Sequence, residues 1–169
     1  MSTIQANIGL GLQVAETIPI GDAEVASPPT VTHQITDAVT LLNASSTPPG
    51  ALVASGSVTL SGGTTTLDLT ECLGPTVNSV PCPVNFTGKK INAYKIRANP
   101  NNTQPITVQA AGSNGYLLLG TSGLMELWPG DSCEHVHNAS LPTVSSTTKA
   151  ITVTSSMTAA QFDIILVGG

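Results

Sequence analysis

The sequence predicts an all-β protein, an antiparallel β-sandwich or jelly-roll-like domain at residues 51–169 that follows an extended N-terminal arm at residues 1–50. Apolar and polar residues alternate with period two in most segments after residue 50. Gly, Pro and Asn separate these segments at spacings of roughly 8–12 residues, as in sandwiches and barrels. Only 9% of the 169 residues are charged and Lys plus Arg number five, which excludes a coiled coil or a helical bundle.

The first 50 residues differ from the rest of the chain. They hold five of the Pro residues, at positions 19, 28, 29, 48 and 49, and no Lys or Arg precedes Lys89. Proline fixes φ and lacks an amide hydrogen, so these positions interrupt any central strand or helix. We therefore expect an extended arm or loosely packed strands. At residues 37–42 the apolar spacing fits either a helical turn or a strand.

The alternating pattern begins at residue 51. Val58 and Leu60 alternate with hydroxyl residues, a Gly-Gly turn follows at 61–64, and Leu67 and Leu69 alternate again, which predicts a β-hairpin. Further strands are expected at 91–98, 106–110, 116–119, 124–128, 150–154 and 162–167. The last of these is apolar on both faces from Ile164 onward, as in a central strand covered on both sides.

Composition also excludes several functions. A net charge of -5 argues against nucleic-acid binding, which relies on Lys and Arg. No positive region and long apolar stretch open the chain, so no signal peptide is expected. The longest apolar runs, at 116–119 and 164–167, are far shorter than the roughly 20 residues of a membrane helix, so no membrane partner is expected.

No enzyme motif is present. The Gly-Thr-Ser-Gly at 120–123 lacks the spacing of a nucleophile elbow, and Gly9-Leu-Gly11 lacks the third glycine of a dinucleotide fingerprint. The ten carboxylates are scattered along the chain. We expect no catalytic residues and no cofactor.

The three cysteines allow two interpretations. Cys72 and Cys82 flank a loop that contains Pro and Gly, so they either form a disulfide or lie as thiols on facing strands. Cys133 belongs to a separate segment with His135 and His137, where alternate positions of a strand would share one face. Thiolate and imidazole are good Zn²⁺ or Cu²⁺ ligands. The alternatives are a solvated or interface strand and a pH-sensitive contact.

Four of the five basic residues cluster in sequence, at Lys89, Lys90, Lys95 and Arg97. They form either a docking stripe for an acidic partner surface or the solvent face of one strand. Trp128, the only tryptophan, precedes Pro-Gly. It either anchors an interface or a sugar, or packs against the end of the sandwich.

An ordered series of motifs runs through residues 42–169. It comprises Leu-Asn-Ala-Ser-Ser-Thr-Pro-Pro at 42–49, Ser-Gly-Gly-Thr-Thr-Thr-Leu-Asp-Leu-Thr at 61–70, Phe-Thr-Gly-Lys-Lys-Ile-Asn-Ala-Tyr-Lys-Ile-Arg-Ala-Asn-Pro at 86–100, Asn-Gly-Tyr at 114–116, Trp-Pro-Gly at 128–130 and Ile-Ile-Leu-Val-Gly-Gly at 164–169. The series resembles small β-rich structural proteins of tailed bacteriophages, some of which look like capsid decoration, or cement, proteins. The loop at 72–82 and the segment 133–137 lie outside the pattern.

The resemblance implies a non-enzymatic virion protein on the capsid exterior, made in the host cytoplasm. Its partners would be the major capsid protein and copies of itself, with a homotrimer as the natural oligomer at a three-fold lattice site. The arm would contact neighbouring subunits by adding strands or filling grooves. The alternative is a phage fibre or cell-surface module, a β-sandwich that binds carbohydrate.

Overall fold

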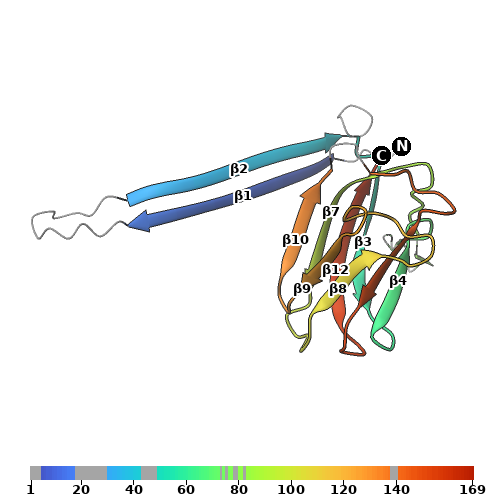
Figure 1. Cartoon of the computed structure of the whole chain (residues 1–169). Helices are drawn as coiled ribbons and strands as arrows, with labels where there is room; N and C mark the ends of the chain where they lie inside the picture. The colour runs from blue at the N-terminus through green and yellow to red at the C-terminus, as the bar shows by residue number, and fades with distance from the viewer. Residues whose placement is uncertain are drawn as a thin grey trace, which may run out of the picture. The chain divides into compact units, whose positions relative to one another are not determined.

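The structure is a computed structural model that describes residues 5–17, 30–42, 49–72, 74, 76–77, 80–81, 83–137 and 141–169. Within these residues the chain forms strands and turns and no helix (Figure 1). The strands are β1 (Gln5–Thr17), β2 (Thr30–Leu42), β3 (Leu52–Thr59), β4 (Thr64–Asp68), β5 (Thr76–Val77), β6 (Val80–Pro81), β7 (Ile91–Ala98), β8 (Ile106–Ala110), β9 (Leu124–Leu127), β10 (Ser132–Val136), β11 (Ala150–Thr154) and β12 (Gln161–Gly168).

Two antiparallel four-stranded sheets carry the fold, and they face each other as in a sandwich (Figure 1). Their strand orders are β10-β7-β12-β3 and β4-β11-β8-β9. The first strand of this set, β3, pairs with the last, β12, over the eight positions from Thr59↔Gln161 to Leu52↔Gly168. Both sheets therefore combine strands from distant parts of the chain.

Two small sheets complete the description. β1 pairs with β2, and β5 pairs with β6. Residues 7–40 form a compact unit of their own, whereas residues 1–6 and 41–169 form the other unit. Residues 37–42, where the apolar spacing fits either a helical turn or a strand, lie in β2.

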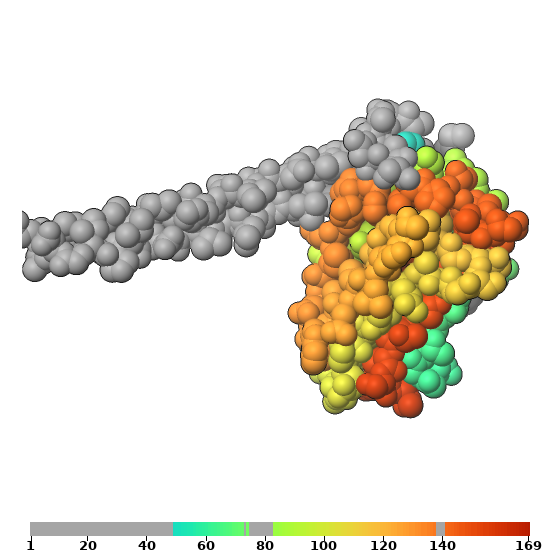
Figure 2. Space-filling model, in the orientation of Figure 1, coloured from blue at the N-terminus to red at the C-terminus, as the bar shows by residue number. Residues whose placement is uncertain are grey.

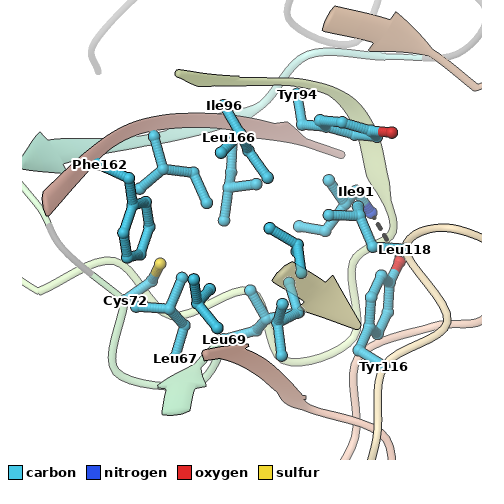
Figure 3. Close-up of a cluster of buried hydrophobic side chains, with 14 of the residues drawn as sticks. Leu67, Leu69, Cys72, Ile91, Tyr94, Ile96, Tyr116, Leu118, Phe162 and Leu166 are labelled. Atoms are coloured by element: carbon cyan, nitrogen blue, oxygen red, sulfur yellow. Dashed lines mark hydrogen bonds between the residues drawn. The ribbon is translucent and has the colours of Figure 1, made fainter. Parts of the chain in front are cut away.

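The core lies between the two four-stranded sheets (Figure 3). In β7, Tyr94, Ile96 and Ala98 are buried and Lys95 and Arg97 are exposed, as the alternation predicts. Burying one large apolar side chain contributes about 1.5–3 kcal/mol. The largest side chains that are almost fully buried are Tyr116, Phe86, Phe162, Leu69, Ile91, Ile96, Ile106, Leu118, Ile151, Leu166 and Val108.

The predicted hairpin across residues 58–69 is wrong in its pairing. The Gly-Gly turn is present, with φ of 63° at Gly62 and 81° at Gly63. However, β3 pairs with β12 and β4 pairs with β11, so this turn carries the chain from one sheet to the other. Period-two alternation shows which side chains face the core but not which strand lies alongside, and both sheets share one core.

The segment 116–119, predicted as a strand, is a turn-rich connection instead. Tyr116 and Leu118 are buried, and the backbone turns through hydrogen bonds from Leu118 N to Tyr116 O (2.9 Å) and from Gly120 N to Leu117 O (3.1 Å). Its apolar residues fill the core without pairing in a ladder. The sandwich obtains its eighth strand from β10, at the segment with Cys133 and His135.

Tyr116 joins three separate parts of the core. Its hydroxyl accepts a hydrogen bond from Ile91 N at 3.0 Å, at the start of β7 (Figure 3). The same hydroxyl donates a hydrogen bond to Pro142 O at 2.9 Å. Burial raises the pKa of Tyr116 above its usual value, so the hydroxyl keeps its proton at neutral pH.

Replacing Tyr116 with Phe is expected to lower the free energy of unfolding by about 1–3 kcal/mol, because the buried Ile91 N–H and Pro142 C=O lose their shared partner. Urea unfolding followed by circular dichroism measures the change. Tyr94→Phe serves as the comparison, since the Tyr94 hydroxyl contacts a thiol rather than two backbone groups. A loss below about 0.5 kcal/mol for Tyr116→Phe would show that water replaces the hydroxyl.

An ion pair links β4 to the residue before β11. Lys149 Nζ lies 2.5 Å from Asp68 Oδ2, and Thr70 donates to Asp68 Oδ1 from both its amide (2.8 Å) and its hydroxyl (2.6 Å). Burial raises the pKa of Asp68, but these hydrogen bonds outweigh it and hold the pKa below its ordinary value of 3.8. The carboxylate is therefore favoured in the folded chain.

The Asp68 contribution to stability is predicted to be complete above about pH 4 and to be lost as pH falls through the lower folded-state pKa. About a third of each side chain is exposed, so solvent screening limits the contribution to about 1 kcal/mol or less. Asp68→Asn should therefore be less stable than the unsubstituted chain at neutral pH, and the difference should shrink on acidification to about pH 2.5. Urea midpoints at several pH values measure this, and a difference that does not change with pH contradicts it.

Candidate functional site

One outer sheet face carries two of the predicted basic residues. Lys95 and Arg97 point away from the core on β7, and the register places Glu134 of β10 and Ile165 of β12 beside Lys95. Arg97 lies between Ser132 and Asp163 in the same way. We call these six residues the charged face.

The charged face is partly neutralised by its own carboxylates. Lys95 Nζ lies 2.8 Å from Glu134 Oε2, with the two side chains 50% and 27% exposed. An exposed pair of this kind contributes about 0–1 kcal/mol. Asp163, opposite Arg97, accepts a hydrogen bond from Ser57 Oγ at 2.5 Å. The face therefore has mixed charge with an exposed apolar centre at Ile165.

The other two predicted basic residues lie elsewhere. Lys89 and Lys90 precede β7, where Lys89 O accepts from Val144 N at 2.8 Å and Lys90 exchanges backbone hydrogen bonds with Gly169. Lys90 and Lys95 are five positions apart, which is about 16 Å along an extended chain. The four residues therefore form two separate pairs rather than one stripe.

Trp128 is 58% exposed at the end of the edge strand β9. Its amide donates to Asp131 Oδ2 at 3.0 Å, which closes the turn at 128–131, and its Nε1 donates to Glu126 Oε1 at 3.1 Å. Leu124 shares this side of β9 and is 62% exposed. Of the two interpretations, the structure places Trp128 on the surface and not within the core.

The side chains of Cys133, His135 and His137 lie on the Tyr94 side of β10 and the residue after it; Cys133 and His137 are half-buried and His135 is exposed. Cys133 lies opposite the buried Ile96, and His135 lies opposite Tyr94. Together with Leu118, Leu119, Leu124 and Met125 they line a solvent-open pocket of about 310 Å³, which we call the β10 cavity. In Figure 2 the yellow-orange surface near residue 120 adjoins the orange surface of β10.

The two histidines lie against each other and against Tyr94. Their ring centroids are 4.4 Å apart, and each ring lies within 6.1 Å of the Tyr94 ring. Burial, followed by the nearby His135, lowers the pKa of His137 to about 4, while a backbone hydrogen bond with Leu118 opposes the shift. His137 is therefore neutral at pH 7.

Burial and the neighbouring Cys133 thiol raise the pKa of Tyr94 to about 12. Among the described side chains, no three of His, Cys, Asp and Glu converge on one point where a metal ion would sit. Cys72 is buried in the core and pairs with Val84 through two backbone hydrogen bonds of 2.9 Å. Cys82 lies outside the described residues, so both interpretations of the Cys72–Cys82 pair stand.

Sequence reasoning did not single out Tyr94, Leu124, Met125 or Ile165 as surface or cavity residues. The sequence did indicate that Tyr94 faces the core, because it alternates with the exposed Lys95 and Arg97 in the same way as the core residues of β7. Leu124 carried no such signal, since an apolar residue in an alternating strand predicts burial. The apolar run from Ile164 predicted a strand covered on both sides, which is wrong at Ile165: β12 is central in its sheet, but this side chain is 45% exposed on the outer face.

No model of a known protein family matches the sequence, and no curated protein matches it. In the described part of the chain, no helix is long and apolar enough to cross a membrane.

Proposed function

We propose that this chain is a virion structural protein that decorates the outside of a capsid, binding the major capsid protein lattice and copies of itself. The observation that carries the proposal is the two-unit organisation, with residues 7–40 forming a unit apart from the sandwich. β1 and β2 pair only with each other in the described sheets. A two-stranded ribbon is marginally stable alone in water, so it needs a surface to pack on. A neighbouring subunit supplies such a surface.

The sandwich is proposed to be a jelly roll, with residues 1–50 as its arm. Four antiparallel pairs support this topology: β3 with β12, β4 with β11, β7 with β10, and β8 with β9. The first of the eight strands pairs with the last, the second with the seventh, and so on inward. Such nested pairs describe one long ribbon that has been rolled into two sheets, as expected of the double Greek key.

Charge supports contact between copies. The ten acidic residues include four before residue 51, at positions 16, 22, 24 and 37, whereas all five basic residues follow it. The arm is therefore acidic, and the charged face offers Lys95 and Arg97 to a neighbour. Complementary charge steers association and fixes its register more than it adds affinity.

The outer face of the second sheet has a different chemistry. Several exposed or half-exposed positions of this face carry hydroxyl groups or an amide, and they lie side by side on paired strands. These residues are Thr64, Thr66, Thr107, Gln109, Thr152 and Thr154. On β9 this face continues with Glu126 and the exposed Leu124, so the uncharged, hydrogen-bonding area covers only β4, β11 and β8. Without large apolar groups, that area resists aggregation at the high local concentration on a shell. This suits a protein displayed in many copies.

Deleting residues 7–40 is predicted to leave a folded sandwich that no longer co-sediments with purified virus-like particles. Residues 51–169 contain both four-stranded sheets, so circular dichroism and cooperative unfolding should survive the deletion. The full chain should co-sediment at a fixed copy ratio in the hundreds per particle. A folded deletion variant that still binds particles at that ratio contradicts the role of the arm.

The exposed Trp128 favours a second candidate, carbohydrate binding by a phage fibre or cell-surface module. An exposed indole flanked by the carboxylates of Glu126 and Asp131 offers both a stacking face and hydrogen-bond acceptors for sugar hydroxyls. A few copies at one vertex or on a tail, rather than hundreds on the shell, would favour this candidate.

Trp128→Ala separates the two candidates. A glycan-binding module should show a hit on a glycan array that the substitution abolishes, together with a sugar-induced change in the fluorescence of this single tryptophan. A decoration protein should show no such hit, and its copy ratio on particles should fall by less than tenfold. Leu124→Ala is the matched control, since this side chain is equally exposed on β9 and lacks a ring.

A further inference from the structure

The β10 cavity contains a donor set that decoration does not use. Cys133, His135 and His137 come from alternate positions at one edge of a sheet, and Met125 comes from the facing strand β9. Two imidazoles, a thiol and a thioether therefore line one cavity of about 310 Å³. Its remaining lining residues are Tyr94 and apolar or glycine positions, and no Lys or Arg is among them.

His137 contributes a buried ring nitrogen to this part of the molecule. Among the described residues, its Nε2 has no hydrogen-bond partner. Leaving a buried nitrogen unpaired is unfavourable, so this atom points to a missing partner.

His135 supplies the second ligand. Its ring centroid is 4.4 Å from that of His137, so the two imidazoles are close enough to share one ion. His135 is exposed, which gives the cavity an entrance from solvent.

We propose that His135 and His137 form a binding site for a late first-row metal cation, with copper preferred because Cys133 and Met125 offer sulfur in the same cavity. Soft sulfur ligands select Cu⁺, and imidazole suits both copper and zinc. The site is built on two histidines, because no three His, Cys, Asp or Glu side chains among those described already converge. Water or the two sulfurs complete the coordination once side chains rotate around a bound ion.

The test uses the untagged full-length chain, whose three histidines are at 33, 135 and 137. Cu⁺ is titrated under ascorbate in competition with bicinchoninate, and Zn²⁺ is titrated by calorimetry. We expect one ion per chain, with Cu⁺ bound more tightly than Zn²⁺. His135→Gln and His137→Gln should each weaken both metals at least tenfold. Cys133→Ser should weaken Cu⁺ more than Zn²⁺.

His33→Gln is the matched control, because it removes the one histidine that lies on β2, in the unit of residues 7–40, and it should leave binding unchanged. His135 is exposed, so His135→Gln should keep the fold and remain informative even if His137→Gln unfolds. The proposal is overturned if no ion binds at 1:1 with a Kd below about 100 µM, or if His135→Gln binds as the unsubstituted chain does. The proposal stands or falls separately from the decoration function, because the assay contains no particles.

Discussion

The pairing of β12 with β3 on one side and β7 on the other is the interaction on which the rest of the sandwich depends. β12 is the last strand, yet it lies inside its sheet and contributes Phe162, Ile164 and Leu166 to the core. Until it joins, β3 has no partner in that sheet and the ribbon of nested pairs stays open. Long-range pairing of this kind must overcome the entropic cost of closing a loop of about a hundred residues. We therefore expect the sandwich to fold cooperatively.

This closure also determines where the functional features lie. The two edges at β9 and β10 carry Trp128, Leu124 and the β10 cavity, while the face that includes β7 and β12 carries Lys95, Arg97 and Ile165. Residues 7–40 belong to neither four-stranded sheet and form a unit of their own. In the proposed decoration role, the sandwich supplies a stable body and surface contacts, and the arm reaches a neighbouring subunit. The proposed metal site would use residues of β10 and of the facing strand β9.

The sequence predicts the sheet class and most strands because alternation and turn chemistry are local. Residues 91–98 and 150–154 match β7 and β11 in full, since each strand places core residues at every second position. The hairpin at 58–69 was wrong because alternation does not identify a partner strand, and 116–119 was wrong because apolar residues also fill cores from turns. In the β10 cavity, period two placed Cys133, His135 and His137 on one side. The alternation in β7 placed Tyr94 on the core side but could not show that it meets the histidines. Met125 and Leu118 come from distant segments, so no local pattern revealed them.

In the proposed decoration role, residues 7–40 gain their stability from a partner rather than from the chain itself. Amide hydrogen exchange followed by mass spectrometry, on the free chain and on the chain bound to virus-like particles, tests this. We expect amides of β1 and β2 to exchange rapidly in the free chain, β7 and β12 to stay protected, and particle binding to slow exchange in β1 and β2 by at least a hundredfold. Strong protection of β1 and β2 in the free monomer, unchanged on binding, would contradict it.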